Sequence, residues 1–251
     1  MRETILKKLD EIEKKENVKI LHCIESGSRA WGFASPDSDY DVRFLYVRPK
    51  EFYLRLDKTR DVIEWQLDET LDVSGWDIRK ALILLYKSNP TVFEWNSSPI
   101  VYHTTEEWKR ISAVIPRYFT AKSGLYHYIS TAKNNCRRYL KEESETASLK
   151  KYFYMLRPIL ACEWILANGT PPPIPFEELK ERYLPEDLRE DVDRLLEMKR
   201  TMPEMGEGRR IARIDDYIDR SIERIDAAIA TMPPAKAHAH AELNELFLSL
   251  L

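Results

Sequence analysis

The loop that joins two strand-like runs near the N-terminus constrains the fold more than any other part of this chain. Residues 18–24 (VKILHCI) and 42–47 (VRFLYV) are apolar runs of strand length and predict two core strands. The connection between them contains Gly27 and Gly32, two of only 7 glycines in 251 residues. Glycines gathered in one loop of a glycine-poor chain indicate a turn where the backbone closely approaches another group.

The same loop carries residue types suited to phosphates and a hard cation. Gly27-Ser28 follows the first run directly, so backbone N–H groups can approach an anion without a Cβ atom in the way, and the Ser28 hydroxyl adds a donor. Ten residues later comes Asp39-Tyr40-Asp41, in which strand periodicity puts both carboxylates on one face. Two such charges ~4 Å apart repel by roughly 4 kcal/mol, which Mg²⁺ would relieve. Either motif alone is more often a solvated loop, but the compound pattern predicts phosphoryl or nucleotidyl transfer.

The stretch ESGSRAWGFASPDSDYDVRFLYV resembles the nucleotidyltransferase motif of the DNA polymerase β superfamily, and specifically the RlaP family, or RNA repair pathway DNA polymerase beta family. Four further segments are similar to that family, so the likeness extends over about residues 15–225: DVSGWDIRKALILLYKSNPTVFEW, SSPIVY, KKYFYMLRPILACEWI and PPPIPFEEL. Ser26 departs from the wider superfamily, where an aliphatic residue commonly precedes the Gly-Ser pair. The resemblance implies a polymerase-β-like domain, two divalent metal ions held by three carboxylates, and transfer of NMP from an NTP with pyrophosphate release.

The resemblance assigns Asp39 and Asp41 as metal ligands and requires a third carboxylate from a neighbouring strand. Asp72 fits best, because it lies between two apolar residues of an extended run and would face away from both. Glu64 has the same local pattern and is the runner-up, whereas Asp77 is better interpreted as a first-turn acid of a helix. We therefore expect Asp39, Asp41 and Asp72 to be catalytic and to bind two Mg²⁺ ions, with Mn²⁺ as the alternative metal.

Further candidates for nucleotide binding come from the loop and from a basic stretch. The full set is Gly27, Ser28, Arg29, Ser38, Lys151 and Arg157. Arg29 and Arg43 could neutralise triphosphate charge or could equally be ordinary ion-pair partners, and Trp31 is either a base-stacking or a packing residue.

The basic stretch, residues 117–157, has nine basic and three acidic side chains with interleaved aromatics. This composition is typical of a nucleic-acid track, with a solvated helical face over a tyrosine-rich core as the equal alternative.

Periodicity divides the rest of the chain. Residues 62–67 and 71–74 predict a hairpin around the turn Asp68-Glu69-Thr70, and a helical pattern starts at Trp76. After residues 97–99 (SSP) and the short run at 100–102 (IVY), the period is almost entirely helical. We expect an α/β (α+β) catalytic domain with a mixed sheet at 1–111 and an all-helical nucleotide- and acceptor-binding domain at 112–251, with a flexible segment near 231–241.

Composition excludes several classes. With 39 basic and 42 acidic residues, the net charge of −3 argues against a generally basic nucleic-acid binder. Three dispersed cysteines support neither a disulfide scaffold nor a thiolate zinc site, and His238 and His240 are poorly placed for a metal. No apolar run reaches membrane-spanning length, so we expect a cytoplasmic protein with no membrane partner.

The expected function is therefore a nucleotidyltransferase of the EC 2.7.7 type. The expected donor is an NTP, with ATP first, and the expected acceptor is an RNA end, such as a tRNA or an RNA 3′ end. An adenylyltransferase acting on a small molecule or a protein, and a non-catalytic nucleotide-binding module, are the alternatives. Base preference, the number of nucleotides added and the oligomeric state stay open.

Overall fold

The computed structural model describes residues 1–66, 70–140, 146–201, 207–234 and 238–251. Two compact units form: the first contains Met1–Ala30, Asp39–Tyr118 and Ala237–Leu251, and the second contains Trp31–Ser38 and Phe119–Lys236. These units divide the chain differently from the predicted boundary at residue 111. The Trp31–Ser38 loop packs with the second unit, and the C-terminal segment packs with the first.

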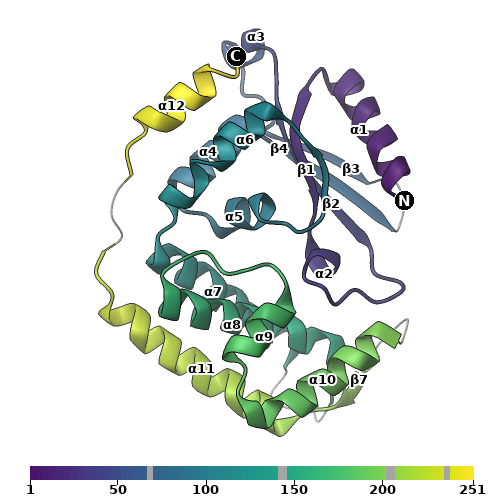
Figure 1. Cartoon of the computed structure of the whole chain (residues 1–251), viewed down its shortest axis with the longest axis vertical. Helices are drawn as coiled ribbons and strands as arrows, with labels where there is room; N and C mark the ends of the chain where they lie inside the picture. Colours follow the sequence, from purple (N-terminus) through teal and green to yellow (C-terminus); the bar gives the residue numbers. More distant parts are fainter. Residues whose placement is uncertain (67–69, 141–145, 202–206, 235–237) are drawn as a thin grey trace. The chain divides into compact units, whose positions relative to one another are not determined.

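The first unit is built on a five-stranded mixed sheet with the order β3-β4-β2-β1-β5 (Figure 1). Its strands are β1 (Lys19–Glu25), β2 (Tyr40–Val47), β3 (Val62–Gln66), β4 (Leu71–Asp77) and β5 (Val101–Thr104). The pair β2–β4 is parallel, whereas β1–β2, β1–β5 and β3–β4 are antiparallel. The parallel pair aligns the N-terminal ends of β2 and β4. The second residue of each strand is acidic, Asp41 in β2 and Asp72 in β4.

Helix α1 (Arg2–Glu16) covers one face of this sheet (Figure 1). Its stripe of Ile5, Leu9 and Ile12 is buried in one cluster with Val42 and Phe44 of β2. The alternate residues of β2 therefore face the other side of the sheet. The helix ends at Asn17, which has a left-handed backbone with a φ of 50.

The predicted hairpin forms as β3 and β4, but β4 extends further than expected. It runs to Asp77 rather than stopping at Ser74, and Asp77 then caps the following helix by accepting the Arg79 N–H. Asp68 and Glu69 of the predicted turn lie outside the described residues. The other helices of this unit are α2 (Gly27–Ala30), α3 (Lys50–Tyr53), α4 (Ile78–Tyr86), α5 (Pro90–Asn96), α6 (Glu106–Ser112), the 3₁₀ helix η1 (Ile115–Tyr118) and α12 (Ala241–Leu248).

Helix α12 packs on α4 in the first unit. Phe247 makes an edge contact with Tyr53 at 5.0 Å between ring centroids, and His240 stacks on Tyr86 at 3.7 Å. The predicted flexible segment near 231–241 lies partly outside the described residues, at 235–237.

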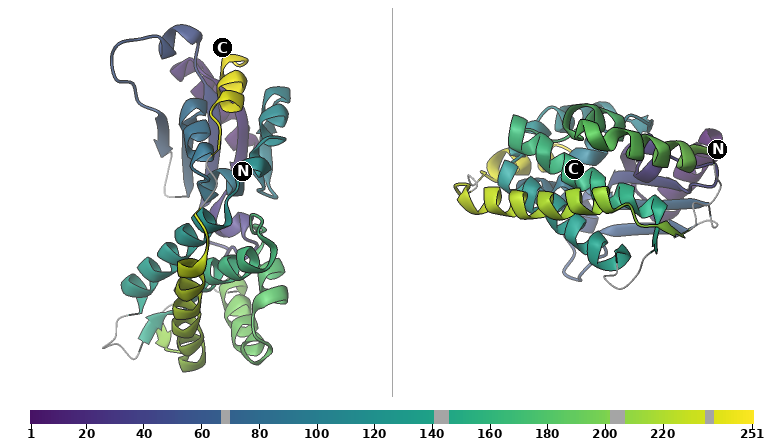
Figure 2. Two further views of the ribbon diagram at one scale, coloured as in Figure 1. Left: turned by 90° about the vertical axis from the view of Figure 1, so that its left-hand side faces the viewer. Right: turned by 90° about the horizontal axis from the view of Figure 1, so that it is seen from below.

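The second unit is helical apart from the two-stranded sheet β6 (Thr146–Ser148) and β7 (Glu207–Arg209). Its helices are α7 (Ala121–Tyr139), the 3₁₀ helix η2 (Leu149–Lys151), α8 (Tyr152–Asn168), α9 (Phe176–Tyr183), α10 (Glu186–Thr201) and α11 (Ala212–Thr231). The isoleucine stripe of α11 is buried where this helix packs along α7 and α8 (Figure 2). Phe33, from the inserted loop, is buried in the same core and stacks on Phe153. In the described part of the chain, no helix has the length and apolarity needed to span a bilayer.

Candidate active site

Gly27 and the Asp41 side chain are in close contact. Gly27 begins α2 directly after β1 and has a φ of 59, a left-handed conformation that favours glycine. A Cβ atom at this position would lie 2.0 Å from Asp41 Oδ2 and 2.9 Å from its Cγ. The Ser26 N–H donates to the Asp41 carbonyl at 2.8 Å, which ties the loop to β2. The glycine of the Gly-Ser motif therefore makes room for the carboxylate of the Asp-x-Asp motif.

Asp72 lies beside Asp41 on the neighbouring strand. The two residues are register partners in the parallel pair β2–β4, so their side chains share a face. Arg43, on the same face, bridges them: its Nη2 lies 3.0 Å from Asp41 Oδ1 and 2.7 Å from Asp72 Oδ2. In this arrangement a guanidinium supplies the positive charge that the two carboxylates need.

The charge of Asp39, the other acid of the Asp-x-Asp motif, also acts on Asp41. Burial raises the pKa of Asp41, the Arg43 guanidinium lowers it, and the charges of Asp72 and Asp39 raise it again. The Asp39 carbonyl accepts a hydrogen bond from Arg29 Nε at 3.1 Å, while the Arg29 guanidinium lies over the Tyr40 ring at 3.7 Å. Asp39, Asp41 and Asp72 thus concentrate negative charge at the N-terminal ends of the inner strands β2 and β4.

This donor set fits a hard divalent cation, because all its side-chain donors are carboxylate oxygens. Within the described residues, no three potential ligand side chains converge closely enough to hold a metal ion as they stand. Arg43 lies between two of the acids, so a metal ion and this guanidinium compete for the same oxygens.

The other two acids considered from the sequence lie elsewhere. Glu64 pairs with Ser74 in the register of the edge strand β3, and its exposed side chain lies 3.4 Å from Arg60. Asp77 is five residues beyond Asp72 along β4, which corresponds to about 16 Å. Asp77 is therefore remote from Asp41.

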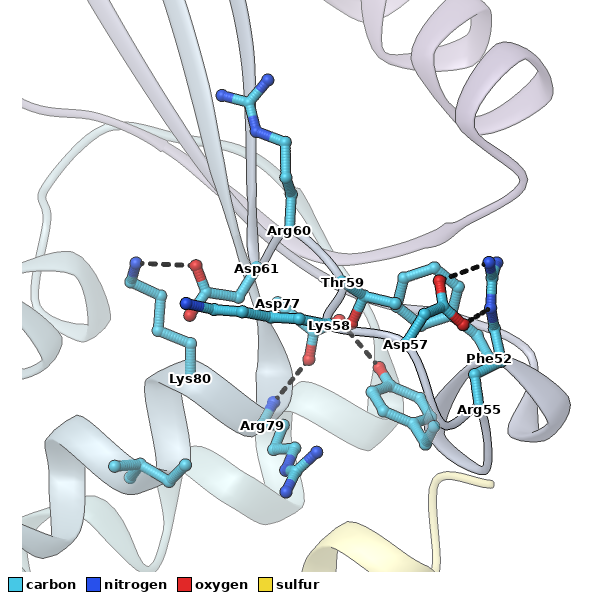
Figure 3. Close-up of a pocket in the computed structure, with 12 residues that line it drawn as sticks. Phe52, Arg55, Asp57, Lys58, Thr59, Arg60, Asp61, Asp77, Arg79 and Lys80 are labelled. Atoms are coloured by element: carbon cyan, nitrogen blue, oxygen red, sulfur yellow. Dashed lines mark hydrogen bonds and ion pairs between the residues drawn. The ribbon is translucent and has the colours of Figure 1, made fainter.

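Asp77 belongs to a polar pocket at the far end of the sheet (Figure 3). Its carboxylate accepts hydrogen bonds from Tyr53 Oη at 3.0 Å and from the Arg79 N–H at 2.8 Å. Burial raises the pKa of Asp77, and these two hydrogen bonds lower it. Two cations at the pocket are paired with its own acids, Lys80 with Asp61 and Arg55 with Asp57. In this pocket Asp77 caps the N-terminus of α4, and the named cations are neutralised by neighbouring acids.

Sequence reasoning missed Glu25, which is fully buried beside the candidate site. Its Oε1 accepts the Asp41 N–H at 2.8 Å, and its Oε2 accepts the Tyr102 hydroxyl at 2.5 Å. Burial raises the pKa of Glu25, and these two hydrogen bonds lower it. An acid at the end of a largely apolar strand, two residues before the Gly-Ser pair, was the available signal.

The remaining predicted binding residues are distributed over both units. Ser28 lies in α2, next to the Asp41 contact, whereas Ser38 belongs to the second unit and closes a turn by bonding the Ser35 N–H at 2.8 Å. Lys151 and Arg157 also belong to the second unit. Arg157 is buried, with its guanidinium 4.5 Å from the centre of the Trp31 ring. The Trp31 ring also contacts Phe33 and Tyr154 of this unit and is only half-buried.

Comparisons with known proteins give one family and one close relative. The model of the RlaP family, described as "RNA repair pathway DNA polymerase beta family", matches residues 1–249. A protein of Bacillus subtilis (strain 168), described as "Uncharacterized protein YcgL", is 43% identical over 254 residues, which cover 99% of this chain and 96% of that protein. A solved nucleotidyltransferase-like protein from Exiguobacterium sibiricum 255-15 is 13% identical with a TM-score of 0.26, over 85% of this chain and 69% of the other.

Proposed function

The chain belongs to the RlaP family, the RNA repair pathway DNA polymerase beta family, and on this premise we propose that it transfers NMP from ATP to an RNA end with the help of Mg²⁺. Membership in the family identifies a polymerase-β-like nucleotidyltransferase. The observation that carries the proposal is the position of Asp41, which lies against Gly27 and beside Asp72. This position supports the proposal because it brings the Gly-Ser turn and two candidate metal ligands together.

Asp39, Asp41 and Asp72 would hold the divalent cations. When bound, the metal supplies charge neutralisation for the triphosphate and a lower pKa for the acceptor hydroxyl. Asp41 is the most constrained of the three, because its carboxylate is partly buried against Gly27 and its backbone N–H is held by Glu25. Such support favours a fixed ligand geometry.

The side chains and backbone of the loop would orient the nucleotide. The N–H groups of Gly27 and Ser28 and the Ser28 hydroxyl would donate to triphosphate oxygens, and Arg29 would add a bidentate guanidinium. The acceptor hydroxyl oxygen then bonds to the α-phosphorus while the bond from that phosphorus to the bridging oxygen breaks, and pyrophosphate leaves. Asp72, whose carboxylate is half exposed, would accept the hydroxyl proton.

The test uses the full chain with Mg²⁺ and each of four α-labelled NTPs, with and without total RNA. Label transferred to RNA, most strongly from ATP, is the expected result. Asp41→Asn should abolish transfer with the fold intact, whereas the matched exposed acid on the edge strand, in Glu64→Gln, should leave transfer unchanged. Label on protein or on a small molecule instead would identify a different acceptor, and binding without pyrophosphate release would contradict the catalytic proposal.

A further inference from the structure

Three lysines of the second unit form a cationic group that has no ion-pair partner among the residues that the structure describes. Lys150 and Lys151 lie in η2, and Lys199 lies in the last turn of α10, which packs on η2. Throughout the described part of the chain, none of these three ammonium groups makes a hydrogen bond or an ion pair. We call these three residues the lysine cluster.

Lys199 is the most unusual member, because it is only 4% exposed. Its Nζ lies 5.6 Å from the centroid of the Phe33 ring, a weakly attractive contact that does not replace a carboxylate. Burial lowers the pKa of Lys199, the charges of Lys150 and Lys151 lower it as well, and the exposed acid Asp37 opposes them. A lysine side chain that is almost fully buried, and whose ammonium makes no ion pair with a described residue, is costly to keep in a folded protein.

Lys180 in the same unit provides an internal comparison. It is also buried, at 7% exposed, but its Nζ lies 2.6 Å from Glu177 and 2.5 Å from Asp193. The fold therefore pairs one buried lysine with two carboxylates and leaves Lys199 among other cations. A structural role explains Lys180 but does not explain Lys199.

Aromatic rings border the lysine cluster. Lys151 Nζ lies 4.7 Å from the centroids of both Tyr139 and Tyr154, and Tyr154 contacts Trp31 edge-on at 5.8 Å. Each of these three rings is only partly buried. Ammonium groups next to accessible aromatic faces are typical of sites that bind phosphates carrying bases.

We propose that the lysine cluster is a phosphate-binding site of the second unit, which takes phosphate groups from a nucleoside triphosphate or from a single-stranded polynucleotide. Three ammonium groups present several donors and three positive charges, which match an anion with more than one charged oxygen. The choice of nucleotide or RNA as the phosphate source rests on the proposed function. The existence of the site rests on the burial and charge of the lysines alone.

The first experiment measures thermal unfolding of the full chain in EDTA with sodium tripolyphosphate, ATP or a short single-stranded RNA. Wild-type protein should be stabilised by at least one of these ligands, and Lys199→Met should weaken that ligand's binding about tenfold. Without ligand, Lys199→Met should unfold at a higher temperature than the wild type, because an unpartnered charge is removed from the core. A lysine with a purely structural role would give the opposite result on removal.

Arg200→Met is the matched control, since it removes one positive charge from the next, exposed residue of α10. It should leave phosphate binding unchanged. If Lys199→Met fails to fold, the half-buried pair can be tested as Lys150→Ala/Lys151→Ala, which should also lose binding. Equal binding by wild type, Lys199→Met and the double variant, or no binding to wild type by any of the three ligands, would overturn the proposal.

Salt dependence separates the two phosphate sources. If RNA is the ligand, each lysine removed should reduce the slope of log K against log salt concentration by about 0.7. If the triphosphate is the ligand, tripolyphosphate and ATP should bind, and Lys199→Met should not change the affinity for RNA.

The Asp41→Asn variant separates this proposal from the catalytic one. It should lose transfer and keep phosphate binding at the lysine cluster. If Asp41→Asn kept full transfer while Lys199→Met lost phosphate binding, the metal centre would be wrong and the lysine site would stand.

Discussion

Replacing Gly27 with alanine tests the contact on which the candidate active site is built. The new Cβ would lie 2.0 Å from Asp41 Oδ2, whereas ordinary contacts begin at 3.4 Å, so the carboxylate must move by about 1.4 Å. The backbone contributes separately, because Gly27 has a φ of 59 and a non-glycine residue in this region costs roughly 1–2 kcal/mol. One substitution therefore strains the loop and displaces the proposed metal ligand.

The expected loss of activity follows from that displacement. A misplacement of about 1 Å at a reacting centre costs on the order of 100-fold in rate. Gly27→Ala should therefore lower the rate of NMP transfer by about 100-fold or more and weaken Mn²⁺ binding. Chemical denaturation should show a loss of roughly 1–2 kcal/mol or more in the free energy of unfolding.

Gly32→Ala is the matched control in the same loop. Gly32 has a φ of 84, but a Cβ there would meet no atom within 4 Å. Gly32→Ala should lose a similar amount of stability, and its rate of NMP transfer should stay within a few-fold of wild type. In a double-mutant cycle, Asp41→Ala should remove the part of the Gly27→Ala cost that comes from the clash. If Gly27→Ala kept wild-type transfer and Mn²⁺ affinity, the reasoning that joins the two motifs would be refuted.

The remaining predictions concern residues in the first unit. Asp72→Asn should abolish transfer and lower Mn²⁺ affinity, measured by titration calorimetry, and Glu64→Gln should do neither; equal effects of both changes would contradict the assignment. Glu25→Gln, which retains hydrogen-bonding capacity, should be close to neutral in stability, whereas Glu25→Ala should cost about 2–3 kcal/mol by leaving two buried donors unpaired. Burial lowers the pKa of His22 from 6.5 to about 4, so the unfolded chain binds the proton more readily between these values. The free energy of unfolding should therefore fall by up to about 3 kcal/mol as pH drops from 6.5 to 4. The His22 ring stacks on Trp108, so His22→Phe keeps an aromatic ring there. Denaturation curves recorded across this pH range should show that this variant lacks the His22 contribution.

Contiguous patterns predicted most of the fold. The two strands around the Gly-Ser loop, the β3–β4 hairpin and the helical second half all follow from the periodic spacing of apolar residues along the chain. This signal is local, since each element buries its own apolar face. The end of β4 was placed too early, because Asp77 can be read either as a strand residue or as a helix cap and serves here as both.

Contacts between segments far apart in the sequence decided which residues surround the candidate active site. The sequence alone marked Gly27, Asp39 and Asp41, because they lie within one loop and their chemistry can be judged from their spacing. The sequence favoured Asp72 over Glu64, but only the parallel register of β2 and β4 places Asp72 beside Asp41. Only tertiary packing buried Glu25 under Tyr102 and buried Lys199 beside the Phe33 ring. Local periodicity reports which face of an element is apolar, whereas contacts between distant segments depend on strand order and packing, which periodicity does not encode.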